Sequence, residues 1–169
     1  MQKTAELDQG TTMPRYAVIP RVNVFLRHGR DVLLLKGAPD KRLWAGRYNG
    51  IGGHVERDED LLTAARREVQ EEAGLAVEDL CLGGIVHVCL SEGPGVLMFL
   101  FTGEAPSREV HPSEEGPLEW VDPALIDDLP AVEDLPVLLP RLLDAPPGAP
   151  PFLARSYYDQ SGQLQVEFG

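Results

Sequence analysis

The sequence predicts an α+β fold in which a mixed β-sheet lies between helices. Three observations favour this fold: strand-like segments come in pairs around short turns, one long amphipathic helix interrupts them, and short proline-flanked helices follow. A chain of 169 residues is long enough for one domain with its own core. We expect residues 1–15 to be a flexible N-terminal arm and residues 16–169 to form that single domain.

The first half of the chain contains a predicted hairpin, a loop and the long helix. Residues 17–26 are apolar and β-branched, residues 28–31 form a turn, and residues 32–36 return as a second strand. Residues 38–53 are rich in glycine, proline and charge, which predicts a loop with a short strand near residues 48–51. Asp60 is a typical N-cap for a helix that runs to about Ala73, and Gly74 suits its C′ position.

The second half contains two predicted hairpins separated by short helices. Residues 81–90 and 96–103 surround a Glu-Gly-Pro-Gly turn, and they are apolar on both faces, which is typical of central strands. Residues 118–121 form another short strand, and residues 123–128 and 132–143 are predicted helices. Residues 152–158 and 164–168 are expected to form a closing hairpin.

The charge of the chain limits its partners. Lys and Arg total 15 against 27 Asp and Glu, a net charge of −12, which argues against binding to duplex nucleic acid. An anionic substrate would need bound cations to overcome this charge, because the nearest basic residues are Lys36, Arg42 and Arg47. Residues 1–13 lack the apolar core of a signal peptide, and no stretch reaches the ~18 apolar residues of a membrane helix. We therefore expect no membrane association and a cytoplasmic protein, with Cys81 and Cys89 buried and reduced.

Acidic residues follow one edge of the predicted long helix. Glu68 and Glu72 lie four residues apart and would repel each other unless a positive charge lay between them. Glu71 falls four residues after Arg67, which can brace it. Such carboxylates suit Mg²⁺ or Mn²⁺, which prefer oxygen ligands. The alternative is a solvated helix with a salt-bridged outer face. The apolar residues of the helix share one arc that faces the sheet: Leu62, Ala65, Val69 and Ala73.

The whole segment from Gly53 to Leu75 resembles the Nudix box, G-x5-E-x7-R-E-U-x-E-E-x-G-U, where U is a bulky aliphatic residue. The pattern is filled without departure by Gly53, Glu59, Arg67, Glu68, Val69, Glu71, Glu72, Gly74 and Leu75. The flanking predicted strands also resemble the Nudix fold, an α/β/α sandwich with a central mixed sheet. The fixed spacing of so many positions makes this a specific signal.

The resemblance implies a metal centre on the helix. In Nudix hydrolases the residues that correspond to Glu68 and Glu72 bind Mg²⁺ or Mn²⁺, the residue that corresponds to Glu71 assists, and the carbonyl of Gly53 would be a further ligand. The resemblance gives Arg67 the task of orienting the acidic cluster. It makes Glu59 and Gly74 structural members of the box.

The reaction implied is substitution by water at a phosphorus of a diphosphate linkage. The metal would lower the pKa of a bound water and offset charge on the phosphate oxygens. A base must take the proton of that water. Glu68 is one candidate, and Glu115 is a second because residues 113–121 resemble the loop that brings an extra glutamate to Nudix sites. The alternative for Glu115 is an exposed loop charge.

Substrate preference is suggested by the segment Leu43 to Gly53, which resembles the Nudix branch that hydrolyses oxidised purine nucleoside triphosphates. That resemblance makes Asn49 a base-contacting residue, whereas the alternative is a turn residue ahead of Gly50. Trp44 could stack on a base or anchor the loop. Asp134 or Glu133 would supply the carboxylate that this branch uses. The aromatic residue of the branch is missing here, and His54 replaces its usual Lys.

We therefore expect a nucleotide pyrophosphohydrolase that converts a nucleoside triphosphate, ribo or deoxy, to the monophosphate and pyrophosphate. Oxidised purine nucleotides are candidate substrates, and nucleoside diphosphates, dinucleoside polyphosphates, nucleotide sugars and mRNA caps are alternatives. A catalytically silent nucleotide-sensing domain is the alternative of another class, and the intact glutamates argue against it. A nucleic-acid-binding protein is a third class, which the net charge disfavours. The protein is expected to be a monomer or a homodimer.

Overall fold

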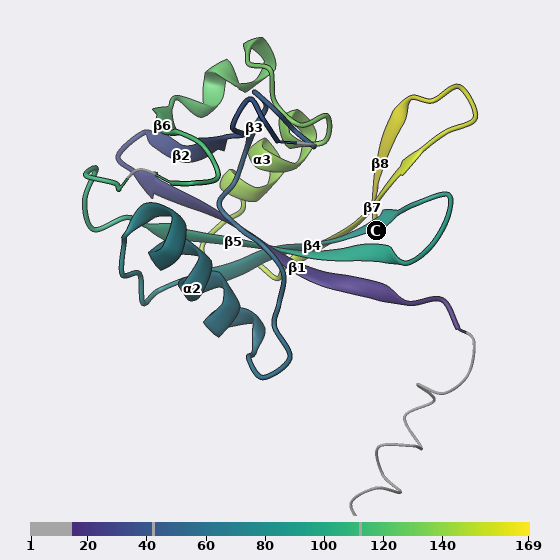
Figure 1. Cartoon of the computed structure of the whole chain (residues 1–169), viewed down its shortest axis with the longest axis horizontal. Coiled ribbons are helices and arrows are strands. Elements are labelled where there is room, and N and C mark those ends of the chain that lie inside the picture. The colour runs from purple at the N-terminus through teal and green to yellow at the C-terminus, as the bar shows by residue number, and fades with distance from the viewer. Residues whose placement is uncertain (1–14, 42, 112) are drawn as a thin grey trace, which may run out of the picture.

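A twisted mixed sheet runs through the molecule and carries helices on both faces (Figure 1). The structure, a computed structural model, describes residues 15–41, 43–111 and 113–169. Of the arm expected over residues 1–15, only Arg15 belongs to the described residues. The strands, in chain order, are β1 (Val18–His28), β2 (Asp31–Lys36), β3 (Tyr48–Asn49), β4 (Cys81–Cys89), β5 (Gly95–Glu104), β6 (Leu118–Val121), β7 (Phe152–Tyr158) and β8 (Leu164–Phe168).

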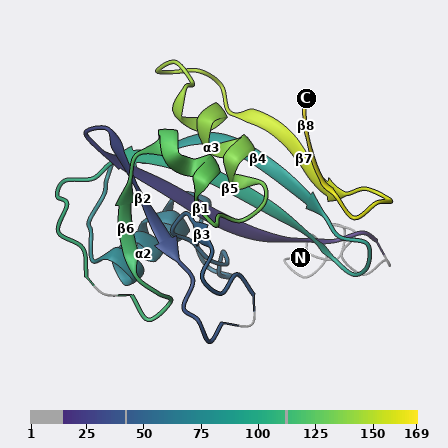
Figure 2. The ribbon, with the colours of Figure 1, turned by 90° about the horizontal axis from the view of Figure 1, so that it is seen from above.

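The strands are ordered β3-β2-β1-β5-β4-β7-β8 in the sheet, and β6 pairs with β2. The pairs β1·β5 and β4·β7 are parallel, and the other pairs are antiparallel. Strands β5 and β4 lie inside the sheet, as their apolar composition predicts. The hairpin β7–β8 extends the sheet at one side, where Figure 2 shows it from above.

Two separate cores lie on the two faces of the sheet. Helix α2 (Leu61–Ala73) covers one face and packs its small and β-branched residues Ala65 and Val69 against Val22 and Val24 of β1. Helix α3 (Leu135–Leu143) and the 3-10 helix η1 (Pro123–Asp128) cover the other face. The α/β/α layering and the α+β class predicted from the sequence are confirmed. No helix in the part of the chain that the structure describes is long and apolar enough to cross a membrane.

Helix α2 begins and ends where its capping residues predict. The Asp60 carboxylate accepts hydrogen bonds from the N–H groups of Leu62 and Thr63, at 2.8 and 3.0 Å. Gly74 ends the helix in the left-handed region, with φ of 69°. A Cβ at this position would also lie 2.4 Å from the His111 ring, so two constraints require glycine here.

The segment Pro123–Asp128 is helical, as predicted, in the 3-10 form. Two sequence-based expectations are wrong in detail. Helix α3 begins at Leu135 rather than at residue 132. The later start has a cause in the sheet: the Val132 N–H donates to the Tyr48 carbonyl at 3.0 Å, which holds residues 131–132 in an extended conformation. Cys81 is exposed and Cys89 is half-buried, so neither is a core residue; both are free thiols.

Candidate active site

Glu68 and Glu72 lie on the edge of α2 that borders the sheet, and both are nearly buried, with exposed fractions of 9% and 7%. The Glu68 carboxylate rests against the backbone of Gly53. A Cβ on that residue would lie 2.3 Å from Glu68 Oε1, so glycine is what allows the close approach. The two carboxylates therefore share one side of the helix, as their spacing predicts.

Arg67 ties the acidic residues of the box together. Its guanidinium makes a two-pronged contact with Glu59, at 3.0 and 2.7 Å. The same group donates to Glu68 Oε1 at 2.9 Å, to Glu71 Oε2 at 3.1 Å and to the His54 carbonyl at 3.0 Å. The hydrogen bonding between Arg67 and Glu59 raises the pKa of Arg67 above its ordinary value and lowers the pKa of the Glu59 carboxyl. The guanidinium thus stays charged and holds Glu68 and Glu71 in fixed positions.

Among the described residues, Glu72 has no ion pair of this kind. Burial, and then the charge of Glu68, raise the pKa of Glu72 to about 7, although the N–H of Gly52 and the Lys41 ammonium offset part of the shift. Within the described residues, Oε2 of Glu72 has no hydrogen-bond partner. An unpartnered, desolvated carboxylate oxygen beside a second glutamate fits a divalent cation, which would satisfy the oxygen and remove the repulsion.

The other predicted metal and base residues occupy different surroundings. The Gly53 carbonyl already accepts a hydrogen bond from the Val22 N–H at 3.0 Å, which leaves it one free lone pair. Glu115 is half-exposed and forms an ion pair with Lys41. Over residues 15–169 apart from 42 and 112, no three His, Cys, Asp or Glu side chains converge as a preformed set of metal ligands.

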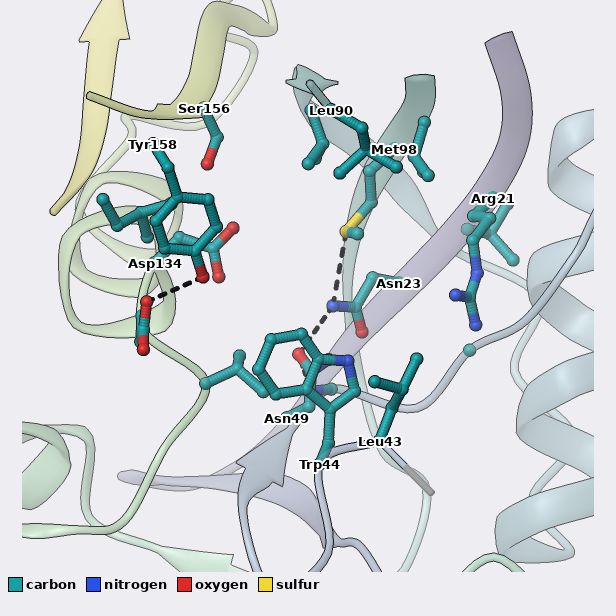
Figure 3. A pocket seen from close by; sticks show the side chains of 18 residues that line it. Arg21, Asn23, Leu43, Trp44, Asn49, Leu90, Met98, Asp134, Ser156 and Tyr158 are labelled. Carbon is teal, nitrogen blue, oxygen red and sulfur yellow. Dashed lines mark hydrogen bonds between the residues drawn. The ribbon is translucent and has the colours of Figure 1, made fainter. Parts of the chain in front are cut away.

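A cavity of about 290 Å³ lies beside the glutamates, between β1, β5, β4 and the hairpin β7–β8 (Figure 3). The structure brings together here all three residues that the sequence suggests for substrate binding: Asn49, Trp44 and Asp134. Trp44 is 45% exposed and has a φ of 64°, so its indole lies at the rim rather than in the core. The remaining lining is Arg21, Val22, Asn23, Leu43, Gly50, Gly52, Val88, Leu90, Val96, Met98, Val132, Glu133, Ser156, Tyr158 and Leu164.

Polar groups are few in this mostly apolar cavity. Asp134 precedes α3 without a side-chain capping bond, and burial raises the pKa of its carboxyl. The Tyr158 hydroxyl donates to Glu133 at 2.8 Å. The Ser156 hydroxyl is buried and has no partner among the described residues. Ser156, Tyr158 and Asn23 were not predicted as site residues, although Asn23 is an amide in an otherwise apolar strand and could have been noticed for that reason.

One end of the cavity leads to the glutamate helix. Gly52 lines the cavity, and its N–H faces Glu72. Arg21 lines the same end of the cavity, and its backbone forms an isolated antiparallel β-bridge with His54. The basic residues named from the sequence serve elsewhere: Lys36 lies over the Tyr48 ring, 5.1 Å from its centroid, and Arg47 donates to the Ala131 carbonyl at 2.9 Å. The third, Arg42, lies outside the described residues.

Comparison with known proteins agrees with this geometry. The family model described as the NUDIX domain matches residues 18–142, which is most of the chain. The protein belongs to the Nudix family. A MutT protein from Bacillus halodurans has the same fold, with a TM-score of 0.76 at 22% identity over 89% of this chain and 97% of that chain.

Two curated relatives have different activities. An oxidized purine nucleoside triphosphate hydrolase from Danio rerio is 34% identical over 98 residues, 57% of this Nudix chain and 61% of the relative. An isopentenyl-diphosphate Delta-isomerase from Clavibacter sepedonicus is 32% identical over 68% of this chain and 62% of the relative. The matches thus span about three-fifths of these relatives' own length.

Proposed function

We propose that this Nudix protein is a metal-dependent pyrophosphohydrolase that converts purine nucleoside triphosphates to monophosphates and pyrophosphate. The observation that best supports this proposal is the cavity that ends at Gly52, next to Glu72. A base seated in that cavity would direct its phosphate chain toward Glu68 and Glu72. Arg21, at the same end, is the cationic side chain best placed to meet the first phosphate.

The residues of α2 fit the chemistry of phosphoanhydride hydrolysis. Glu68 and Glu72 would hold Mg²⁺ or Mn²⁺, with Glu71 and the free lone pair of the Gly53 carbonyl as assisting ligands. When bound, the ion would activate water and offset charge on the phosphate oxygens. Arg67 keeps Glu68 oriented through the 2.9 Å hydrogen bond.

The general base would be Glu68 or Glu115. Lys41 neutralises Glu115 by pairing with it, so that carboxylate is poorly placed to accept a proton. Glu68 engages Arg67 through Oε1 only, which leaves Oε2 without that competing bond. We therefore assign proton acceptance from the attacking water to Glu68.

The lining of the cavity supports a purine base as its occupant. Apolar walls with a few convergent polar groups are typical of small-molecule sites, and an indole at the rim offers a stacking surface. Asn49 and Asp134 supply hydrogen-bonding groups for a base edge. An isoprenoid diphosphate has no hydrogen-bonding groups in its hydrocarbon part, so it would leave these amide and carboxyl groups unpaired, at a cost of about 1–3 kcal/mol each. Oxidised purine nucleoside triphosphates, named in the description of the Danio rerio relative, are included in the proposed substrates.

The test is hydrolysis of a panel of nucleoside triphosphates, diphosphates, dinucleoside polyphosphates and nucleotide sugars with Mg²⁺. We expect pyrophosphate and nucleoside monophosphate from purine triphosphates, with and without an 8-oxo group. Glu72→Gln is the matched inactive control. A second arm incubates the protein with isopentenyl diphosphate. Isomerisation without nucleotide hydrolysis, or tight nucleotide binding without any turnover, would overturn the proposal.

A further inference from the structure

Asn23 is a buried amide in the middle of an apolar strand. It is 6% exposed, between the buried residues Val22 and Val24 of β1, and it lines the cavity. Among the described residues, its Oδ1 has no hydrogen-bond partner. Such an oxygen costs about 1–3 kcal/mol of folding free energy. An apolar side chain would stabilise the strand better, so a role in the adjoining cavity is the more economical explanation.

Asn23 holds the Asn49 side chain in one orientation. Its Nδ2 donates to Asn49 Oδ1 at 2.9 Å (Figure 3). The backbone N–H of Gly50 donates to the same oxygen at 2.8 Å. The Gly50 N–H can only donate, so the Asn49 atom that it meets must be the oxygen. The Asn23 atom that faces this oxygen must then be the nitrogen, because two oxygens would repel. Turning Asn49 over would destroy both hydrogen bonds, and turning Asn23 over would destroy the one that it donates.

The contact also depends on Gly50. A Cβ at this position would lie 2.2 Å from Asn23 Oδ1, so only glycine permits the two amides to come together. The second N–H of Asn23 points toward Met98 Sδ at 3.8 Å, a weak acceptor. Both hydrogens on the Asn23 nitrogen are therefore engaged, and Asn23 Oδ1 lies against the backbone of Gly50. The group that Asn49 can offer a ligand is its NH₂ group.

We infer that Asn23 is a positioning residue that makes Asn49 a hydrogen-bond donor toward the cavity, so that the site prefers 6-oxopurine nucleotides to 6-aminopurine nucleotides. The inference rests on the proposed function and deepens it. With both donors bound to its oxygen, Asn49 is saturated as an acceptor. A carbonyl oxygen on the base edge accepts from the Asn49 NH₂ group, whereas an amino group at the same place would oppose N–H to N–H.

The experiment compares kcat/KM for inosine and adenosine triphosphates, which differ at the base in the 6-oxo or 6-amino group and in the N1 proton that accompanies the 6-oxo group. Guanosine and 2,6-diaminopurine riboside triphosphates repeat the comparison with a 2-amino group present. We expect wild type to favour the 6-oxo member of each pair by about tenfold, the effect of one mispaired hydrogen bond. Asn23→Leu keeps the branching at Cγ and removes the unpartnered oxygen, so it should fold, and the preference should fall close to one.

Two further variants separate positioning from structural support. The Asn23→Asp carboxylate, at alkaline pH, can only accept, so it opposes the Asn49 oxygen that the Gly50 N–H holds. Asn49 then loses its fixed orientation, and the preference for 6-oxo nucleotides should fall. The double variant Asn23→Leu with Asn49→Ala should lose no more discrimination than Asn49→Ala alone, because both changes act through one amide. The matched control is Val96→Ala, which shortens an apolar wall and should lower kcat/KM equally for both members of a pair.

The outcomes distinguish this inference from the proposed function. The inference would be overturned if the wild-type enzyme showed no preference for 6-oxo nucleotides, or if a folded Asn23→Leu variant kept that preference. In both cases hydrolysis would continue, so the proposed function would stand. Binding of inosine and adenosine monophosphates, followed by NMR titration, needs no turnover. If the protein hydrolysed no nucleotide but its binding preference depended on Asn23, the proposed function would be refuted and the positioning role supported. If wild type and Asn23→Leu showed the same binding preference, the positioning role would be refuted.

Discussion

Replacing Glu72 by Gln should make the metal-free protein more stable and the metal-loaded protein inactive. Burial and Glu68 raise the pKa of Glu72 from 4.5 to about 7. A carboxyl with a raised pKa in the folded state favours folding at low pH, and that contribution is lost as the pH rises from about 4.5 to about 7. The difference between these pKa values corresponds to about 3 kcal/mol of unfolding free energy. Gln resembles the protonated carboxyl, so the variant avoids this loss.

The assay is urea unfolding in EDTA across pH 4 to 8.5, for wild type, Glu72→Gln and Glu71→Gln. At pH 8 the Glu72→Gln protein should exceed wild type by about 3 kcal/mol, or roughly 6–12 °C in Tm, and near pH 4 the two should converge. Glu71 is the control, because its side chain is 59% exposed and its charge remains hydrated. Mg²⁺ should then stabilise wild type but not Glu72→Gln, whose kcat should fall at least about a hundredfold. Equal stability of wild type and Glu72→Gln at pH 8 in EDTA would refute the reasoning.

Three further changes test other parts of the site. Arg67→Lys keeps the charge but cannot make the two-pronged contact with Glu59. We expect kcat to fall and the free energy of unfolding to fall by about 1–3 kcal/mol. Unchanged midpoints of urea unfolding would contradict the bracing role. Chelation should abolish hydrolysis and most nucleotide binding, and Mg²⁺ or Mn²⁺ should restore both; tight calorimetric binding of a triphosphate in EDTA would contradict this. Asn49→Ala should cost about 1–3 kcal/mol of discrimination between bases while hydrolysis persists, whereas equal losses across all nucleotides would make Asn49 a turn residue only.

The helix and the grouping of its acidic residues were predictable because local signals agree. Asp60, the apolar arc of α2 and Gly74 fix its ends and its buried face without reference to the rest of the chain. The box spacing then predicted which glutamates lie together and that Arg67 braces them. The strands were predictable for a similar reason, since each is apolar and bounded by turn residues.

The cavity was only partly predictable, because distant segments build it. Asn49 and Trp44 precede the box and could be inferred from the family resemblance, whereas Asn23 depends on the pairing of β1 with β5 and on the approach of Gly50. The start of α3 was missed for the same kind of reason: the contact of Val132 with Tyr48 is non-local, and it overrides the helical tendency of the segment. Composition could not reveal either contact.

The hairpin β7–β8 lies beyond residue 142, where the family match ends, yet it supplies Ser156, Tyr158 and Leu164 to the cavity wall. On the proposed function, part of the wall around the base is therefore encoded in a stretch separate from the box. Substitutions in the final twenty residues would then change which nucleotide is accepted without disturbing a single residue of the box. Relatives that share the box but differ in this terminal ribbon should not be assumed to share a substrate, and recombining the two stretches offers a route to altered selectivity.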